Sequence, residues 1–197
     1  MKRFWSILIA TVLLSISAAA QVETFEIDPW HSAAQFAVRH LSLSTIRGVF
    51  TKMSGTVQYD PSDPSKTVMD VSIDAASINT RVEVRDKDLR SPDFFDVEKY
   101  PTITFKSKHA EAQGKSKMKI TGDLTIHGVT KEVVLQVDGL NGPIKDPHGN
   151  RRAGASATTQ ISRKDFGVSG APDTVGDEIL ITIDVEIVKR APAAEPK

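Results

Sequence analysis

The sequence has no cysteine among its 197 residues, so neither disulfides nor thiolate chemistry is open to it. Its 25 Lys and Arg residues are matched by 25 Asp and Glu residues. No basic excess therefore exists that would attract nucleic acid or an anionic lipid surface. The apolar run near the start, residues 4–16, is shorter than the about 20 residues that a membrane-spanning helix needs.

Motifs of common enzyme classes are also lacking. The 5 histidines are scattered and form no H-x-x-x-H or H-E-x-x-H pair that would bind a metal. There is no G-x-S-x-G nucleophile elbow, and no glycine-rich phosphate loop precedes a helix. A mixed charge run, residues 81–90, is typical of a solvated helix face. We therefore expect no catalytic residues, no metal site and no cofactor.

The start of the chain has the pattern of a secretory signal peptide. Lys2 and Arg3 precede the apolar run, and residues 18–20 are small. Cleavage after Ala20 lowers the basic count from 25 to 23 against 25 acids, a net charge of about −2. An uncleaved membrane anchor is the alternative. Export without cysteine indicates a soluble periplasmic or secreted protein, with no membrane span after signal removal.

The rest of the chain is of a size for one domain. We predict a signal peptide over residues 1–20, a domain over residues 21–190 and a flexible tail over residues 191–197, which is rich in Pro and Ala.

Apolar and polar residues alternate through most of the domain, as they do in half-buried strands. The strands that this period predicts span residues 34–39, 50–59, 68–74, 102–109, 118–126, 131–140, 152–161 and 179–188. A short strand at residues 24–27 adds to an edge, and a change of parity after Lys52 predicts a bulge near Gly55. Turn residues separate the strands and most connections are short, which favours an antiparallel meander.

One long interruption, residues 75–100, breaks the meander. Within it Thr80 and Glu83 match a capping box in front of a charged helix over residues 82–90. The apolar face of this helix is thin, so we expect it to lie across another part of the fold and outside the core.

A second helix-start signal follows in the same interruption. Ser91 and Pro92 have the residue types of an N-cap and a first helical position, which predicts a short helical turn. This turn places Phe94 and Phe95 near the start of the strand predicted over residues 102–109. Adjacent residues cannot point the same way, so we expect one ring to plug an opening and the other to stay accessible or to lie on the outer helix face.

Eight antiparallel strands can close into a barrel or split into a sandwich, and the pattern leaves both open. The last predicted strand favours a barrel, because a strand so long and regular would invite aggregation if one edge were unpaired. An eight-stranded barrel is either filled by its side chains or just wide enough for one slim ligand. Small residues at inward positions would leave room: Ala153, Ala155, Ala157, Gly122 and Gly139. Sharp bends of the strands are the other explanation for them.

Five blocks of sequence resemble the YceI-like polyisoprenoid-binding family. They are IDPWHSAAQFAVRH (residues 27–40), RGVF (47–50), DLRSPDFFDVEKYPTITF (88–105), GDLTIHGVTK (122–131) and ISRKDFG (161–167). The resemblance implies an all-β fold, an eight-stranded antiparallel lipocalin-like β-barrel with a short helical insertion over one opening. It also implies an elongated apolar cavity that holds an isoprenoid quinone, a quinone precursor, a polyprenyl phosphate or a similar long-chain amphiphilic lipid.

Strand parity and this resemblance together predict the residues that line such a cavity. They are Phe36, Val38, Phe50, Phe105, Leu124, Ile126 and Ile181. Ordinary core packing is the alternative for each of them. From the predicted helical turn, at least one of Phe94 and Phe95 is expected to join them and contact the ligand. His31 and His127 lie beside turns, where they would hydrogen-bond loop backbone or the polar end of a ligand.

We therefore expect a non-catalytic carrier that binds, sequesters or transports a long-chain isoprenoid in the periplasm. A lipid-modifying enzyme or isomerase that uses the same cavity is the alternative, and conversion of the bound lipid over time would reveal it. A homodimer stays open.

Overall fold

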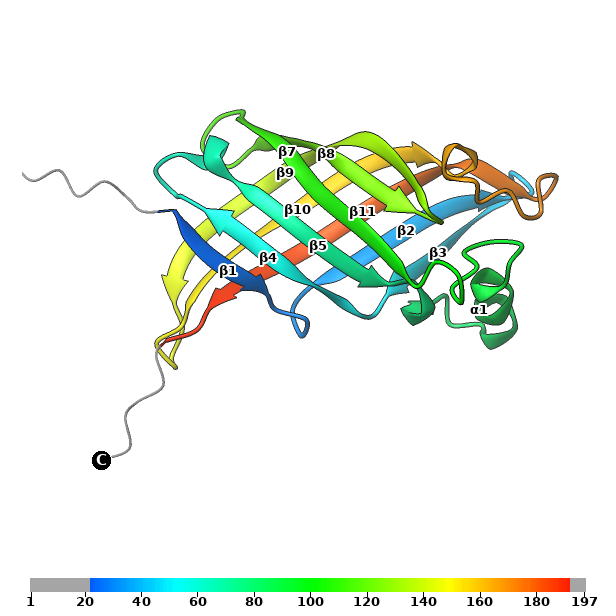
Figure 1. Cartoon of the computed structure of the whole chain (residues 1–197), viewed down its shortest axis with the longest axis horizontal. Coiled ribbons are helices and arrows are strands. Elements are labelled where there is room, and N and C mark those ends of the chain that lie inside the picture. The colour runs from blue at the N-terminus through cyan, green and yellow to red at the C-terminus, as the bar shows by residue number, and fades with distance from the viewer. Residues whose placement is uncertain (1–21, 192–197) are drawn as a thin grey trace, which may run out of the picture.

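The computed structural model describes residues 22–191, which form an all-β barrel with a single α-helix (Figure 1). The predicted signal peptide and nearly all of the predicted tail lie outside the described residues. The strands are β1 (Glu23–Ile27), β2 (Ala33–His40), β3 (Ser44–Phe50), β4 (Met53–Tyr59), β5 (Val68–Asp74), β6 (Ile78–Asn79), β7 (Thr102–Ala112), β8 (Met118–Ile126), β9 (Val129–Lys145), β10 (Arg151–Ser162) and β11 (Val175–Lys189). The helix is α1 (Glu83–Arg90), and 3-10 turns lie at Pro64–Lys66, Ala75–Ser77 and Lys164–Phe166. None of the described helices has the length and apolarity to cross a membrane.

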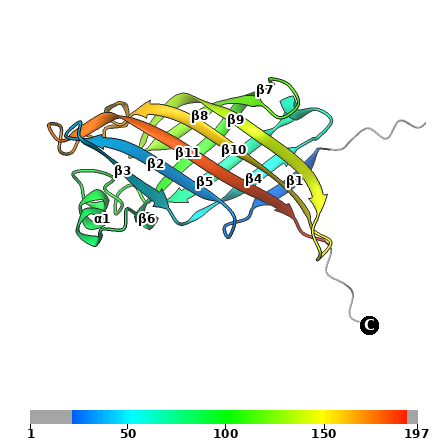
Figure 2. The same ribbon diagram turned by 180° about the vertical axis from the view of Figure 1, so that it is seen from behind.

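Eight strands close into an antiparallel ring in the order β1-β4-β5-β7-β8-β9-β10-β11, with β11 paired back to β1. The sheet continues from β11 through β2 and β3 to β6 (Figure 2). β1 and β2 run one after the other along β11, so they act as one strand interrupted at residues 28–32. β3 and β4 are related in the same way. The prediction of an eight-stranded barrel is confirmed.

The alternation in the sequence becomes the inside and outside of this ring. In β8 every second residue is buried, from Met118 to Ile126, and the residues between them are half-exposed. β11 pairs with β10 along one edge, and with β2 and then β1 along the other. The expectation that the last strand pairs on both edges is therefore confirmed.

Two strand predictions differ from the structure at the place where the ring closes. The segment predicted to add to an edge is β1, which pairs with both β4 and β11 and so completes the ring. The strand predicted over residues 50–59 is divided into β3 and β4 at Thr51 and Lys52, whose backbone N–H groups donate to the carbonyl and hydroxyl oxygens of Ser77. This break explains the change of parity. The bulge predicted near Gly55 is wrong, because β4 and β5 pair there without a shift.

The helical insertion is confirmed but its ends are built differently. α1 begins at Glu83, and its N-cap residue Val82 provides no side-chain hydrogen bond. The predicted capping box is therefore wrong: the Thr80 hydroxyl and N–H both donate to the buried carboxylate of Asp86, at 2.5 and 2.8 Å. Arg90 ties the other end of α1 to the barrel by donating to the backbone carbonyls of residues 76 and 78.

The predicted second helical turn is present only as a single hydrogen-bonded turn, in which the N–H of Phe94 donates to the carbonyl of Ser91 at 3.1 Å and the N–H of Asp93 donates to the Ser91 hydroxyl at 3.4 Å. Residues 92–95 form irregular turns, and the N–H of Phe95 reaches back to the carbonyl of Leu89 at 3.0 Å. α1 and these turns lie at one end of the elongated barrel, and the described chain begins and ends at the other (Figures 1 and 2).

Candidate ligand-binding cavity

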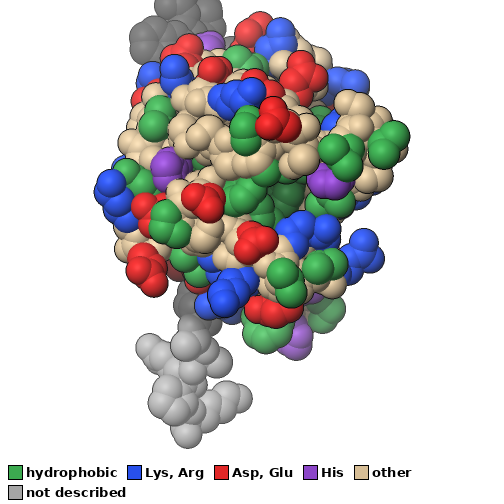
Figure 3. Space-filling view, turned by 90° about the vertical axis from the view of Figure 1, so that its right-hand side faces the viewer, with side chains coloured by type: hydrophobic (Ala, Val, Ile, Leu, Met, Phe, Trp, Pro, Cys, Tyr) green, Lys and Arg blue, Asp and Glu red, His purple; other side chains and the backbone are tan. Residues whose placement is uncertain are grey.

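The interior of the barrel contains an apolar cavity of about 220 Å³. Figure 3 looks onto the end that carries α1, where hydrophobic side chains form the floor of a hollow. Among the described residues that line the cavity, Arg163 is the single charged one. A water molecule inside would find few of the two to four polar partners that it needs, so these walls favour an apolar occupant.

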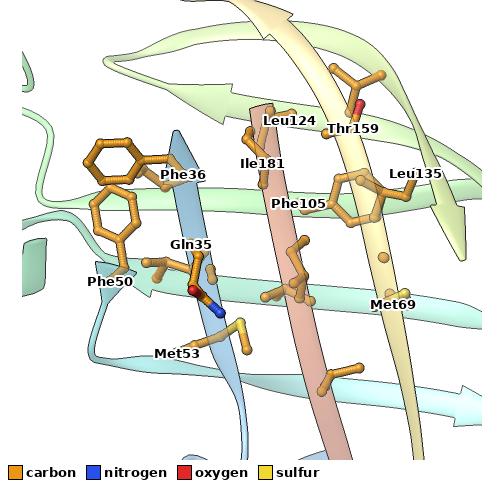
Figure 4. A pocket seen from close by; sticks show the side chains of 18 of the residues that line it. Gln35, Phe36, Phe50, Met53, Met69, Phe105, Leu124, Leu135, Thr159 and Ile181 are labelled. Carbon is orange, nitrogen blue, oxygen red and sulfur yellow. The ribbon is translucent and has the colours of Figure 1, made fainter. Parts of the chain in front are cut away.

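All of the side chains predicted to line a cavity are on its wall: Phe36, Val38, Phe50, Phe94, Phe95, Phe105, Leu124, Ile126 and Ile181. Figure 4 shows several of them, contributed by β2, β3, β7, β8 and β11. Their contact with a ligand stays a prediction.

The side chains of β11 show that the cavity is long. Alternate residues from Ile179 to Ile187 all line it. At about 3.3 Å per residue this stretch measures about 26 Å. Ile181 and Ile183 point inward but are only half-buried, since the space beside them is not filled by other side chains. The shape suits one slim chain better than a compact ring system.

Aromatic rings narrow the cavity at the end near α1. The rings of Phe36 and Phe50 are 5.9 Å apart, and Phe95 packs edge-on against Phe50 at 5.7 Å. Phe94 lies against Gly170 of the loop after β10, so close that a Cβ on this glycine would be 3.0 Å from the Phe94 ring. Both adjacent phenylalanines are half-buried and line the cavity. The expectation that one of them stays outside is therefore wrong, because the irregular backbone after α1 turns both rings inward.

Glycines make room for two of these rings. A Cβ on Gly122 would lie 2.5 Å from the Phe105 ring and 2.5 Å from the carbonyl oxygen of Lys106. Gly48 meets the Phe36 ring in the same way. The expectation that Gly122 leaves an empty interior slot is therefore wrong, since Phe105 fills it. Gly139 is exposed, with φ of 65°, and contributes no interior space.

The predicted alanines do contribute space. Ala153, Ala155 and Ala157 face the cavity from β10, and the half-buried Thr159 follows them on the same face. Figure 4 labels Thr159 beside Phe105 and Leu135. Small side chains along β10 thus keep that side of the cavity wide.

Arg163 is 5% exposed and organises the loop beside the cavity opening. Its guanidinium donates to the backbone carbonyls of four residues at 2.8 to 2.9 Å: Val168, Gly170, Val175 and Gly176. Burial lowers the pKa of Arg163, and the charge of Asp177 opposes that shift. Because the carbonyls occupy its donors, this arginine is a clamp for residues 164–176, and no periodic signal in the sequence marks it.

The two histidines predicted to hold the polar end of a ligand are not on the cavity wall. The His31 ring hydrogen-bonds Asp28 at 3.0 Å on the outside of the barrel, and its side chain is 56% exposed. His127 lies in the turn between β8 and β9, where its ring packs edge-on against Tyr100 at 4.5 Å. Neither histidine lines the cavity.

Several lining residues were not predicted, although the same period of two marks them. They include Met53, Met69, Leu135, Ile183 and Val185. Each of them lies on a strand that the alternation predicted to be half-buried. Leu89 of α1 also lines the cavity and carries no comparable signal.

Outside the cavity, Asp28, His31 and Glu186 lie close enough together to suggest a cation site. Arg152 already occupies it, since its guanidinium is 2.6 Å from the Asp28 carboxylate and 3.1 Å from that of Glu186. Burial alone would raise the pKa of Asp28, but hydrogen bonds from Arg152, His31 and the Trp30 N–H outweigh it and lower this pKa to about 2. The group is a structural ion-pair network.

Comparisons with known proteins agree with this architecture. Residues 25–187 match the YceI-like domain. A UPF0312 protein of Vibrio cholerae serotype O1 is 38% identical over 173 residues, which cover 86% of this chain and 91% of that protein. A solved YCEI protein of Campylobacter jejuni is 36% identical and has a TM-score of 0.69 over 78% of this chain and 90% of its own.

A polyisoprenoid binding domain from Saccharophagus degradans, implicated in plant cell wall breakdown, shares the fold. It has a TM-score of 0.63 over 87% of this chain and 100% of its own, at 16% identity. The match to the domain extends through the described barrel, from β1 to β11. This chain therefore belongs to the YceI-like family.

Proposed function

We propose that this protein is a carrier that holds one long-chain isoprenoid, or a similar amphiphilic lipid, in the barrel cavity. The observation that carries the proposal is the cavity itself, about 220 Å³ of space with apolar walls along the barrel. A wall made mostly of apolar side chains selects by shape and apolar area, and so suits a tail better than a polar substrate. The polyisoprenoid binding domain from Saccharophagus degradans, with the same fold, supports an isoprenoid as the ligand class.

The energetics of tail burial are favourable. One five-carbon unit contributes roughly 3 to 4 kcal/mol when its methylene equivalents leave water at about 0.8 kcal/mol each. Association costs about 4 to 15 kcal/mol, so a few units inside the cavity outweigh it. Units beyond the cavity add little, and the affinity should level off with tail length.

The proposed site of action is the periplasm, after removal of the predicted signal peptide. The support for it is the leader pattern in residues 1–20 and the lack of cysteine. A lipid made in a membrane could not cross an aqueous compartment unaided, and an enclosed apolar cavity supplies the shielding that it needs.

Native mass spectrometry of the protein purified from its own periplasm tests the proposal. We expect a stoichiometric adduct whose extracted mass is that of a long-chain isoprenoid. Ala155→Phe places a ring in the cavity from β10, so this variant should bind no lipid or only a shorter one. The matched control is Thr158→Phe on the exposed outer face of the same strand, which should leave the adduct unchanged.

Bare protein, or equal adducts in both variants, would refute the carrier. Incubation of the loaded protein, followed by a second mass measurement, separates carriage from chemistry. A bound lipid whose mass changes with time would show an enzyme that uses the cavity.

A further inference from the structure

The hairpin between β2 and β3 ends in two exposed leucines at the cavity-mouth end of the barrel. Leu41 is 51% exposed and Leu43 is 82% exposed. The tip is fixed to the Arg163-clamped loop, because the N–H of Leu41 donates to the carbonyl of Thr174 at 2.7 Å. Val175, the next residue, lines the cavity. The hairpin tip is thus held beside the opening, at the end of the barrel away from the ends of the described chain (Figure 1).

The backbone at this tip is unfavourable for the residues that it carries. Leu41 and Ser42 have φ of 50° and 57°, and the N–H of Leu43 donates to the carbonyl of His40 at 3.0 Å across the turn. A tight turn with two positive φ values favours Asn and Gly, and a bulky side chain there is strained. A strained position that also exposes a large apolar side chain is a candidate for function, since neither folding nor solubility explains it.

The charged residues of the hairpin itself are all of one sign. Residues 29–59 contain no Asp or Glu, whereas Arg39 and Arg47 lie on the outer face of the hairpin. Arg39 donates to the Thr45 hydroxyl and to the carbonyl of Ser42, both uncharged groups, so its charge stays available. The neighbouring loop carries the exposed Asp173, so the positive charge is local to the hairpin.

We propose that this hairpin tip docks the cavity mouth onto an anionic lipid bilayer, with Leu41 and Leu43 inserted among the lipids and Arg39 and Arg47 at the headgroups. The inference rests on the proposed function, since a carrier of a membrane lipid must meet the membrane with its opening. A convex tip of two leucines suits a deformable bilayer, because a protein partner would need a matching pocket. Exposed apolar residues flanked by cations are the pattern of interfacial anchors.

Insertion of the leucines must contribute more to the binding free energy than the attraction between the arginines and the headgroups. The whole molecule has no basic excess, so it is not steered from a distance, and the cations act only once the tip is within about 8 to 10 Å of the surface. We therefore expect binding to weaken only mildly with added salt and to depend strongly on the leucines.

The first test compares variants for binding to vesicles of phosphatidylcholine with and without phosphatidylglycerol. Leu41→Asn combined with Leu43→Thr should lower vesicle binding at least about tenfold, because most of the free energy of transferring two leucine side chains from water into the bilayer is lost. Asn accepts the positive φ, so the variant should melt at the wild-type temperature or above it. Ile144→Thr is the matched control: it removes a 66% exposed apolar residue near the opposite end and should bind like the wild type.

A second test reads the tip directly. The chain has no cysteine, so Ser42→Cys can be labelled at one site with a polarity-sensitive fluorophore while both leucines are kept. Its emission should shift to the blue on vesicles containing phosphatidylglycerol, and a label on Ile144→Cys should not respond.

Equal vesicle binding by the leucine variant and the wild type would overturn the proposal, as would a silent tip fluorophore. A concentration-dependent dimer that the same variant abolishes, without vesicle binding by the wild type, would overturn it in favour of a contact between copies of the chain. Lipid extracted from the same samples separates this proposal from the carrier function. If isoprenoid is bound but vesicle binding does not depend on the leucines, the docking proposal is refuted and the carrier function stands. If the leucines dock the protein on vesicles but no isoprenoid is bound, the carrier function is refuted and the docking proposal stands.

Discussion

The ring of Phe105 on β7 lies over Gly122 on the neighbouring strand β8, and this contact shows how single residues shape the cavity. The Phe105 ring occupies the space that any side chain at position 122 would need. Parity correctly predicts that both residues point inward. The contact between them depends on the distance between two neighbouring strands. The alternation of apolar and polar residues does not specify that distance.

Gly122→Ala tests this fit. The added methyl group would lie 2.5 Å from both the Phe105 ring and the Lys106 carbonyl oxygen, and the backbone atom cannot move aside. Overpacking of this kind typically costs about 1 to 3 kcal/mol. We expect the free energy of unfolding in urea to fall by that amount. Gly149→Ala is the control, since a Cβ there would meet nothing closer than 3.9 Å, although its φ of 82° carries a backbone cost. Gly122 does not have a positive φ, so the loss in Gly122→Ala should come from overpacking alone, and an unchanged free energy of unfolding in that variant would contradict the close fit.

Phe94 and Phe95 allow a prediction about ligand release. Both are half-buried at the mouth, so replacing both by Ala should leave a folded protein. Loss of the rings opens the exit while the rest of the cavity is retained, and a bound fluorescent isoprenoid analogue should therefore dissociate faster. Stopped-flow displacement measures the rate.

The buried Phe105, 7% exposed, serves as the control for the mouth residues. Phe105→Ala should cost about 3 to 5 kcal/mol of stability and alter release less. A folded Phe94 and Phe95 double variant that releases the analogue at the wild-type rate would rule out their action as a lid.

At the scale of elements, the loop of residues 164–176 depends on one side chain. It has a single 3-10 turn, and Arg163 binds four of its carbonyls from inside. The loop contributes Phe166 and Val168 to the cavity wall, so its order and the shape of the mouth are coupled.

Arg163→Lys should loosen this loop. An ammonium group carries three donors on a flexible stem and cannot match the planar fork of the guanidinium. Buried carbonyls left without donors cost about 1 to 3 kcal/mol each, partly offset by water that enters. Hydrogen exchange should speed up in residues 164–176 and stay slow in β8. Lys164→Arg at the exposed neighbouring position is the control. Unchanged exchange in the Arg163 variant would contradict the clamp.

For the whole molecule, the sensitive place is the seam where the first and last strands meet. β1 and β11 share only the pairs Glu26 with Val188 and Ile27 with Ile187. Ion pairs reinforce the seam: Arg152 bonds Asp28 and Asp146, and Glu23 bonds Arg151 and Lys189. Hydrogen bonds from Asn150 and Arg152 hold the pKa of Asp146 well below its ordinary value.

The seam predicts a loss of stability in acid. The pKa of Asp28 is about 2 in the fold against an ordinary value of 3.8, so its contribution is complete above pH 3.8 and is lost as the pH falls through 2. The contribution is on the order of 1 to 2 kcal/mol after solvent screening. The melting temperature should drop between pH 4 and pH 2 by this linkage.

Asp28→Asn removes the titrating group while keeping its shape. This variant should be less stable than the wild type at pH 7, and its stability should change less between pH 4 and pH 2. A wild-type melting temperature that does not change with pH over this interval would show that the ion pairs do not hold the seam.

The sequence by itself determined the alternation of the strands, the position of α1 to within one residue and the inward direction of the cavity side chains predicted on the strands. These properties are local, because the pleat sets the period of two and a helix start depends on a few neighbouring residues. Only the tertiary structure decided that β1 closes the ring, that Phe94 and Phe95 both turn inward, that His31 and His127 stay off the cavity wall, and that Arg163 clamps the mouth. Each of these depends on contacts between segments distant in the chain. The alternation of residues predicts which face of a strand is apolar, but it does not predict which strand lies beside it.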